Sequence, residues 1–458
     1  MKSVTTYENE KVLVLGLAKS GVSAAKLLHQ LGAIVTVNDA KKFEDNPEAQ
    51  ELLELGIRVV TGGHPVELLD EDFSLLVKNP GIPYTNPILE KAMEQGVPIM
   101  TEVELSYQVS EAPIIGITGT NGKTTTTTMI GKVLNQGEET PKAYLSGNIG
   151  IPASEVCQKV SQKDLLVMEL SSFQLLGIDS FHPHIAVITN LYEAHLDYHG
   201  TREEYVKAKW RIQQNMTEKD YLVINANQEE LRELSKQTKA TVIPFCTNGW
   251  SEQGAYELGG ELFYQQEKIM SVSDLGVVGQ HNVENALAAI VVAKLNHTAN
   301  ASIKEALSTF TGVPHRTEYL GMSQGRKFYN DSKATNILAT EKALSGFDNT
   351  KVILLAGGLD RGNSFEELEP SLAGLKGLVV FGETQDKLIT AGHHVQLPFM
   401  KKVNTMEEAV QVAVDYSQSG DTILLSPACA SWDQYPNFEI RGDRFRQAVE
   451  KIMKEMSL

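Results

Sequence analysis

Short apolar runs of strand length recur along this chain, and a segment with helical periodicity follows each of them. The runs span residues 11–15, 34–38, 74–78, 113–118, 165–169, 185–190, 351–356, 377–381 and 421–425. Helices are expected over residues 21–31 and, well buried, over residues 282–295. Alternating strands and helices build parallel sheets, so the pattern predicts an α/β protein. The less regular stretch from Trp250 to Asp274 is given no element.

The chain is long enough for several domains. It has 458 residues, and at roughly 150 residues per domain this suggests three. The strand–helix pattern restarts at Ala112 and again after Gly312-Val313-Pro314. We therefore predict domains over residues 1–108, 109–313 and 314–458.

Charge and hydropathy exclude several classes of partner. Lys plus Arg number 41 and Asp plus Glu 58, for a net charge of −17, which argues against non-specific binding to nucleic acid or to anionic membranes. No apolar run approaches the roughly 18 residues of a membrane span, and the polar first ten residues lack the core of a signal peptide. The three cysteines are too scattered for disulfides or a zinc pair, and buried free thiols are expected. We expect a monomeric cytoplasmic protein with small-molecule partners.

A glycine-rich loop is the strongest local signal. Gly119-Thr120-Asn121-Gly122-Lys123-Thr124-Thr125 follows an expected strand and opens an expected helix. Backbone N–H groups and the helix N-terminus bind phosphate in this context, while Lys123 reaches the outer phosphates and Thr124 reaches Mg²⁺. Ile117 stands where the usual P-loop has its first glycine, so this is a variant loop.

Acidic and basic side chains follow in the same region. Glu169 ends an apolar run and is a candidate Mg²⁺ ligand. His195 and His199 have the i, i+4 spacing of zinc ligands, but no cysteine or second pair supports zinc. His195 follows the end of an expected strand, which favours an Mg²⁺ or phosphate contact. Lys209, from the residues alone, is expected on the solvated face of a helix.

A second glycine turn lies near the N-terminus. Gly16-Leu17-Ala18-Lys19-Ser20-Gly21 has the spacing of the dinucleotide-binding fingerprint, but Ala18 replaces the middle glycine. Asp39 stands where a ribose-binding acid is expected. Taken alone, this turn predicts an NAD-dependent oxidoreductase. The Ala18 departure weakens that interpretation.

Six motifs, in order along the chain, resemble the Mur ligases, the ATP-dependent amide-forming enzymes of peptidoglycan precursor synthesis. They are the loop 119–125, the segment 168–172 with Glu169, the segment 193–197 with His195, the segment 279–285, Pro314-His315-Arg316, and the segment 330–336. The matches cover nearly the whole chain. The Rossmann-like start and the segments 426–433 and 437–442 are most similar to the members that add D-glutamate.

The resemblance implies three α/β domains. They are a Rossmann-like N-terminal domain that binds the UDP substrate, a central P-loop-type ATPase domain with a parallel sheet, and a Rossmann-like C-terminal domain that binds the amino acid. The implied activity is an ATP-dependent ligase that joins D-glutamate to UDP-N-acetylmuramoyl-L-alanine through an acyl phosphate. The implied cofactors are ATP and Mg²⁺.

The resemblance also implies the roles of individual residues. The ATP contacts are Gly119, Thr120, Asn121, Gly122, Lys123, Thr124, Thr125, Asn282, Asn285, Arg316 and Asp331. The metal ligands are Thr124, Glu169, His195 and Lys209, and the catalytic residues are Lys123, Glu169, His195 and Lys209. Lys209 is implied to be carbamylated. CO₂ adds to a neutral amine, and a nearby Mg²⁺ favours the anionic product.

Both substrates have implied contacts. Those of the UDP substrate are Leu17, Ala18, Lys19, Ser20, Asp39, Ala40, Lys41, Asn79, Gly81 and Asn148. Those of D-glutamate are Lys333, Thr335, Ser431 and Phe438. Three alternatives stay open at this point: another Mur or folylpolyglutamate-type ligase, a P-loop ATPase switch, and the NAD-dependent enzyme.

Overall fold

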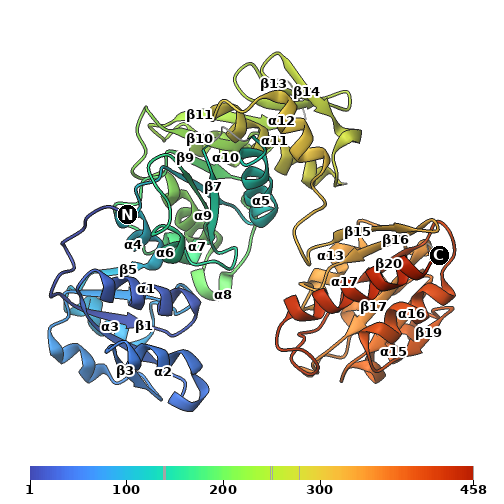
Figure 1. Ribbon diagram of the computed structural model, residues 1–458, viewed down its shortest axis with the longest axis horizontal. Helices are drawn as coiled ribbons and strands as arrows, with labels where there is room; N and C mark the ends of the chain where they lie inside the picture. The colour runs from blue at the N-terminus through green and yellow to red at the C-terminus, as the bar shows by residue number, and fades with distance from the viewer. Residues whose placement is uncertain (138–140, 248, 250, 278, 457–458) are drawn as a thin grey trace. The chain divides into compact units, whose positions relative to one another are not determined.

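The computed structural model describes residues 1–137, 141–247, 249, 251–277 and 279–456, so Trp250 lies outside the described residues. The chain forms two compact units, Met1–Thr309 and Phe310–Leu458. Three sheets, of five, nine and six strands, follow one another along the chain (Figure 1). The predicted three-part α/β architecture is confirmed. The predicted domain boundaries stay a prediction.

The first sheet has five parallel strands in the order β3-β2-β1-β4-β5. Its strands are β1 (Lys11–Leu15), β2 (Ile34–Asp39), β3 (Arg58–Thr61), β4 (Leu75–Lys78) and β5 (Ile99–Thr101). Its helices are α1 (Lys19–Gln30), α2 (Pro47–Glu54), α3 (Pro87–Glu94) and α4 (Glu102–Val109). The edge strand β3 is absent from the sequence prediction because its residues are only partly buried and form no apolar run.

The central sheet has the order β14-β13-β12-β11-β10-β9-β6-β8-β7. Its strands are β6 (Ile114–Thr118), β7 (Ala143–Gly147), β8 (Leu165–Glu169), β9 (Ile185–Ile188), β10 (Tyr221–Asn225), β11 (Thr241–Cys246), β12 (Ala255–Leu258), β13 (Glu261–Tyr264) and β14 (Glu267–Ser271). Its helices are α5 (Lys123–Leu134), α6 (Ala153–Val156), α7 (Ser172–Leu175), α8 (Leu196–His199), α9 (Arg202–Trp210), α10 (Glu229–Ser235), α11 (Gln280–Leu295) and α12 (Asn300–Ser308).

Most of this sheet is parallel, but its far edge is not. β12, β13 and β14 pair antiparallel, within the stretch that received no element from the sequence. These strands have only four or five residues and keep part of their surface exposed, so their apolar pattern is weak. The expected buried helix is α11, which is buried from Ala286 to Ala293.

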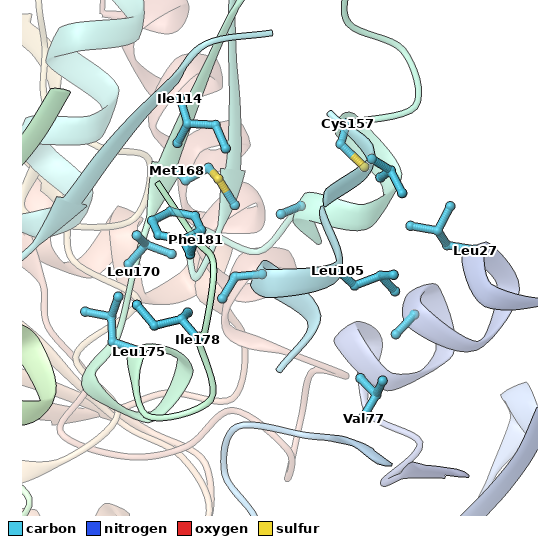
Figure 2. Packing of buried hydrophobic residues seen from close by; sticks show 14 of the residues in the cluster. Leu27, Val77, Leu105, Ile114, Cys157, Met168, Leu170, Leu175, Ile178 and Phe181 are labelled. Carbon is cyan, nitrogen blue, oxygen red and sulfur yellow. The ribbon is translucent and has the colours of Figure 1, made fainter. Parts of the chain in front are cut away.

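One hydrophobic core joins the first two sheets. It includes Leu27 of α1, Leu105 of α4, Cys157 next to α6, and Met168 of β8, all fully buried. Figure 2 shows these side chains in one cluster. The shared core explains why the first two sheets form a single compact unit. Of the three free cysteines, Cys157 and Cys429 are buried as expected, while Cys246 is only half-buried.

The C-terminal unit has one sheet in the order β15-β16-β20-β17-β18-β19. Its strands are β15 (Glu318–Ser323), β16 (Arg326–Asn330), β17 (Val352–Gly357), β18 (Gly377–Phe381), β19 (Met400–Lys402) and β20 (Thr422–Leu425), and only β15 pairs antiparallel. Its helices are α13 (Ile337–Leu344), α14 (Glu369–Leu372), α15 (Gln385–His394), α16 (Met406–Tyr416) and α17 (Phe438–Glu455). Among the described residues, no helix is long and apolar enough to cross a membrane.

A buried carboxylate stabilises the amino edge of the central sheet. The imidazoles of His182 and His184 lie 2.7 and 3.1 Å from the Asp220 carboxylate. The Thr217 N–H and hydroxyl donate to it at 2.7 and 2.9 Å. Burial acts to raise the pKa of Asp220, but these hydrogen bonds outweigh it and lower the pKa to about 2.

This carboxylate gives a pH-dependent prediction. The pKa of Asp220 is lower in the folded protein than its ordinary value of 3.8, so its stabilisation is present above about pH 4 and is lost towards pH 2. We expect the free energy of unfolding to lose about 2 kcal/mol over this range through Asp220 alone. Urea denaturation at about pH 5 and about pH 2 should show a smaller loss in Asp220→Asn than in the unmodified protein. Equal losses in the two proteins would contradict the prediction.

Candidate active site

The glycine-rich loop has the strand–turn–helix setting that its sequence predicted. β6 ends at Thr118 and α5 begins at Lys123, with Gly122 at φ 78° as the residue before the helix. A Cβ on Gly119 would lie 1.9 Å from Thr189 Oγ1, so no larger residue fits there. The Lys123 ammonium donates to the carbonyl oxygens of Gly119 and Thr120, both at 2.9 Å. The loop thus holds its own lysine where phosphate oxygens are expected.

α11 supports this loop from the side. Asn285 Oδ1 accepts a hydrogen bond from the Thr126 hydroxyl at 3.1 Å. A Cβ on Gly122 would lie 2.4 Å from the same oxygen. The Asn285 amide donates to Asn282 Oδ1 at 3.3 Å. The fold therefore brings Asn282 and Asn285, two of the predicted ATP contacts, next to the phosphate loop, although they lie about 160 residues further along the chain.

Glu169 ends β8, the strand next to β6. Its side chain is buried, and its Oε1 accepts a hydrogen bond from the Asn148 amide at 2.7 Å. Its Oε2 is buried without a hydrogen-bond partner among the described residues. Buried carboxylate oxygens are normally satisfied, so this oxygen is suited to ligate a cation. Asn148, predicted to contact the UDP substrate, here orients Glu169.

Lys209 is buried, so the solvated position expected from the residues alone is wrong. It is 2% exposed, and its ammonium lies 4.8 Å from the centre of the Tyr205 ring. Burial, and then the positive charge of Lys123, lower the pKa of Lys209 well below its ordinary value, while Glu169 acts in the opposite direction. Sequence periodicity could not show this burial, because α9 has little amphipathic character and is polar overall.

His195 belongs to the same electrostatic group. Burial lowers its pKa, and Lys209 and Lys123 lower it further. A buried carboxylate oxygen, an imidazole and a lysine of depressed pKa therefore share one environment. Such a set fits Mg²⁺ once the lysine carries a carbamate, because Mg²⁺ prefers oxygen ligands. Among the residues that the structure describes, no group of three or more His, Cys, Asp and Glu side chains is arranged to hold a metal ion.

Aromatic rings hold His195 and His199 in place. The Phe173 ring lies 5.0 Å from the ring of His195 and stacks on that of His199 at 5.3 Å. His199 Nε2 lies 2.9 Å from the Ser172 hydroxyl, an arrangement that supports a structural role more than the zinc alternative. The Tyr205 hydroxyl donates to Thr120 Oγ1 at 3.1 Å, which ties this cluster to the phosphate loop.

Except for Asn148, which follows β7 of the central sheet, the residues predicted for the UDP substrate gather at the carboxyl edge of the first sheet. Asp39 accepts hydrogen bonds from the N–H groups of Leu17 and Lys41 at 2.7 and 2.8 Å. The Asn79 amide donates to Ser20 Oγ at 3.2 Å. Gly16, at φ 98°, leaves no room for a Cβ, which would lie 2.8 Å from Asn79 Cβ. Asp39 therefore stabilises the glycine turn through the Leu17 N–H, a role that the ribose-binding interpretation did not include.

The residues predicted for D-glutamate and the remaining ATP contacts lie in the C-terminal unit. The Lys333 ammonium lies 4.3 Å from the centre of the Phe438 ring. Asp331 accepts hydrogen bonds from the Ser426 hydroxyl at 2.7 Å and the Thr317 N–H at 3.0 Å, and burial raises its pKa to about 6. The backbone of Thr335 bonds to Lys333, and that of Ser431 to Tyr435, so neither contact assigns their side chains a role. Arg316 is exposed.

Arg361 is a further candidate that is absent from the residues predicted from the sequence. Its guanidinium lies 4.9 Å from the ring centre of Trp432, which is itself exposed and follows Ser431 directly. The predicted amino-acid substrate, D-glutamate, has two carboxylates. If Lys333 binds one of them, as predicted, Arg361 is a candidate for the other. The sequence signal was an arginine beside glycines shortly after a predicted strand.

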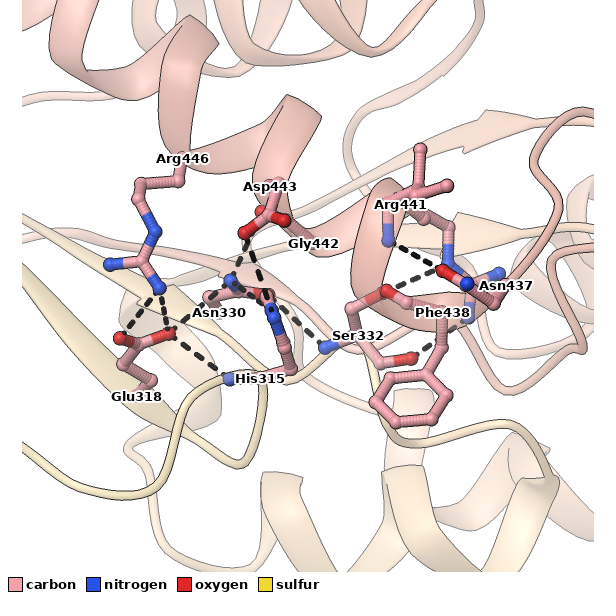
Figure 3. A network of polar contacts seen from close by, with 11 residues as sticks. His315, Glu318, Asn330, Ser332, Asn437, Phe438, Arg441, Gly442, Asp443 and Arg446 are labelled. Atoms are coloured by element: carbon pink, nitrogen blue, oxygen red, sulfur yellow. Dashed lines mark hydrogen bonds and ion pairs between the residues drawn. The ribbon is translucent and has the colours of Figure 1, made fainter. Parts of the chain in front are cut away.

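A buried arginine connects the segments that carry these residues (Figure 3). Arg441 is fully buried, and its side chain donates to Ser332 O at 2.9 Å, Cys429 O at 3.0 Å and Ser332 Oγ at 3.1 Å. A longer bond of 3.4 Å reaches Gly357 O. Ser332 Oγ in turn donates to Phe438 O at 2.8 Å. Arg441 therefore joins the loops after β16 and β20 and the end of β17 to the start of α17.

We expect Arg441→Met to destabilise the protein by about 3 kcal/mol or more, because several buried acceptors lose their donor at once. The matched control is Arg444→Met, an exposed position on the same helix, where a change within about 0.5 kcal/mol is expected. Urea denaturation followed by circular dichroism measures both values. A similar small change in both variants would show that the Arg441 network adds little to stability.

Three family models match the chain in order. The Mur ligase MurD-like N-terminal domain matches residues 10–101, the Mur ligase middle domain residues 117–293, and the Mur ligase glutamate ligase domain residues 315–429. The UDP-N-acetylmuramoylalanine–D-glutamate ligase of Enterococcus hirae is 64% identical, and the match covers 98% of each chain. The protein of the same name from Enterococcus faecalis is 64% identical over 99% of each chain.

The chain belongs to the Mur ligase family.

Solved structures agree with this family at the level of the fold. The UDP-N-acetylmuramate-alanine ligase of Thermotoga maritima is 21% identical, with a TM-score of 0.58 over 96% of this chain and 99% of that one. A second Mur ligase of Thermotoga maritima, solved with ADP, is 17% identical, with a TM-score of 0.53 over 99% of this chain and 97% of that one. The family resemblance predicted from the six motifs is confirmed.

Proposed function

We propose that this Mur ligase joins D-glutamate to UDP-N-acetylmuramoyl-L-alanine in an ATP-dependent reaction of peptidoglycan synthesis. The observation that carries the proposal is the identity of 64%, over 98% of the chain, to a relative named for this activity. The three alternatives, which are another Mur or folylpolyglutamate-type ligase, a P-loop switch and an NAD-dependent enzyme, have no comparable support. Cytoplasmic location and a monomeric state remain predictions.

The reaction starts when the carboxylate of the nucleotide sugar attacks the γ-phosphorus of ATP, so that an acyl phosphate forms and ADP leaves. The amine of D-glutamate then attacks the acyl carbon. Phosphate leaves from the tetrahedral intermediate, the amine loses a proton, and the amide forms. Phosphoryl transfer depends on positioning and charge neutralisation. Lys123 meets this need. Its ammonium donates to loop carbonyls in the structure. It is proposed to donate to the β- and γ-phosphate oxygens when ATP is bound.

Glu169, His195 and Lys209 are proposed to hold Mg²⁺ together with Thr124. When bound, Mg²⁺ neutralises part of the negative charge that otherwise keeps the carboxylate and the triphosphate apart. The unpartnered Oε2 of Glu169 supports this assignment. The depressed pKa of Lys209 supports its carbamylation, because the neutral amine is the form that adds CO₂.

The second substrate is proposed to bind at the C-terminal unit. Lys333 and Phe438 lie together there. Thr335 follows Lys333 in the loop after β16, and Ser431 lies in the loop between β20 and α17. The ammonium of Lys333 suits one carboxylate of D-glutamate, and Arg361 suits the other. The hydrogen bonds of Arg441 and Ser332 fix the backbone at Ser332, next to Lys333, and at Phe438.

Phosphate release tests the proposed function. The protein is incubated with ATP, Mg²⁺ and UDP-N-acetylmuramoyl-L-alanine, with D-glutamate, L-glutamate, L-lysine or no acceptor. We expect release with D-glutamate only. Release that needs neither acceptor nor nucleotide sugar would overturn the ligase and favour a nucleotide-driven switch. Release with L-lysine instead would move the chain to another amino-acid specificity.

A further inference from the structure

Lys78, the last residue of β4, is a buried lysine that the proposed mechanism does not use. Its side chain is 1% exposed. Its ammonium donates to Pro80 O at 3.1 Å and to the Tyr198 hydroxyl at 3.4 Å, and lies 4.8 Å from the centre of the Tyr84 ring. Burial lowers its pKa to about 8, with no acidic group acting in the opposite direction.

A buried ammonium without a carboxylate is costly to the folded state. Lysines are rarely buried unless an acid pairs with them, because desolvation of the charge is not compensated. Within the described ranges, Lys78 has no such ion pair, and its partners are a carbonyl, a phenol and a ring. Residues that reduce stability in this way are most often kept at functional sites.

The contacts of Lys78 connect two parts of the first compact unit. Tyr198, on α8, has its hydroxyl 3.1 Å from Ile82 O and 3.3 Å from Pro80 O. Lys78 and Tyr198 therefore both bond to the turn 79–82 and to each other. This turn carries Asn79 and Gly81, two of the predicted contacts of the UDP substrate, and the Asn79 side chain reaches the glycine turn at Ser20.

Through Phe173, the Tyr198 ring is also connected to the proposed metal ligand His195. The Tyr198 ring lies edge-on to Phe173, with centroids 4.6 Å apart. The same Phe173 ring contacts His195 and His199. The turn 79–82, the pair Lys78–Tyr198, Phe173 and His195 thus form a continuous packed path from the first sheet to the central sheet.

We propose that Lys78 and Tyr198 form a latch that positions the turn 79–82 for the nucleotide sugar and fixes it against the α8 segment. Lys78 is a positioning residue, since it acts through Asn79 and Gly81 and does not itself contact the substrate. Its uncompensated positive charge also favours an anionic ligand, such as a diphosphate, at the neighbouring glycine turn. The inference rests on the proposed function, because it takes UDP-N-acetylmuramoyl-L-alanine as the ligand.

Two variants and one control test the latch. Lys78→Met keeps the length of the side chain and removes the charge, and Tyr198→Phe keeps the ring and removes the hydroxyl. The control is Lys91→Met on α3, in the same domain, where the lysine pairs with Asp70 at 2.6 Å. Calorimetry gives Kd for UDP-N-acetylmuramoyl-L-alanine and, separately, for ADP with Mg²⁺, and thermal unfolding gives Tm.

We expect Lys78→Met and Tyr198→Phe each to weaken binding of the nucleotide sugar about tenfold, with Kd for ADP unchanged. The double variant should be no weaker than the worse single one, because both changes open one latch. Tm of Lys78→Met should equal or exceed that of the unmodified protein, since an unpaired buried charge is removed. Lys91→Met should bind both ligands normally.

Unchanged nucleotide-sugar binding in both variants would overturn the latch, as would equal losses for the nucleotide sugar and ADP. If Lys78→Met fails to fold, Tyr198→Phe alone decides by the same criterion. If the unmodified protein itself does not bind the nucleotide sugar, the proposed function fails first, so the two failures are distinguishable.

Discussion

Lys123→Ala is expected to lower kcat by about a thousandfold or more, with little effect on stability. Lys123 is the cation that the phosphate loop holds at the start of α5, and no other lysine of the loop can replace it. Removing one preorganised donor that stabilises the charge developing in a transition state typically lowers kcat by about 10²–10³-fold. Here a full positive charge is also lost. Phosphate release in the presence of all three substrates measures the effect.

Lys132→Ala is the matched control for this prediction. Lys132 lies on the same helix, α5, in its last turn. We expect its kcat to stay within about twofold of the unmodified protein, because it lies two turns away from the loop. Near-normal turnover in Lys123→Ala would show that the glycine-rich loop is a structural turn and that the phosphates bind elsewhere.

Lys209→Gln is expected to lower kcat by about 10²–10³, because the amide cannot form a carbamate and one ligand of the proposed metal is lost. The depressed pKa of Lys209 also predicts how carbamylation depends on pH. Its neutral amine is available well below the ordinary lysine pKa, so carbamylation should not require alkaline conditions. Activity near neutral pH should fall when CO₂ and bicarbonate are removed, and should recover when bicarbonate returns.

Lys207→Gln controls for the loss of a lysine on the same helix. Lys207 lies two residues earlier on α9, exposed and paired with Glu204 at 2.6 Å, and its replacement should leave kcat unchanged. A carbamate signal from isotopically labelled bicarbonate should appear in the NMR spectrum of the unmodified protein and disappear in Lys209→Gln only. A fully active Lys209→Gln, or a signal that persists in it, would contradict carbamylation at this residue.

The two halves of the proposed site differ in how well the sequence anticipates them. The phosphate loop needs a strand, glycines of positive φ and a helix start, all within about a dozen neighbouring residues. Asn282 and Asn285 required the family resemblance, because only the packing of α11 against α5 brings them to Gly122. Arg361 was not predicted, because an arginine beside glycines in a loop does not by itself indicate a binding role.

The strands also differ in how well the sequence predicts them. The parallel strands β6, β8, β17 and β20 are buried along their whole length and mainly apolar, so their sequences alone predict them. The edge strand β3 and the antiparallel strands β12–β14 are short and partly exposed, and they are stabilised by pairing partners rather than by their own composition.

The sequence by itself determined the α/β class, the phosphate loop and the family, because strand–helix alternation, glycine turns and ordered motifs are properties of neighbouring residues. Only the tertiary structure decided which lysines are buried. Lys78 and Lys209 stand in segments that also suit a solvated lysine, and Arg441 lies on an ordinary amphipathic helix. Their burial, and with it their depressed pKa values and shared networks, arises from segments distant in the chain that pack over them.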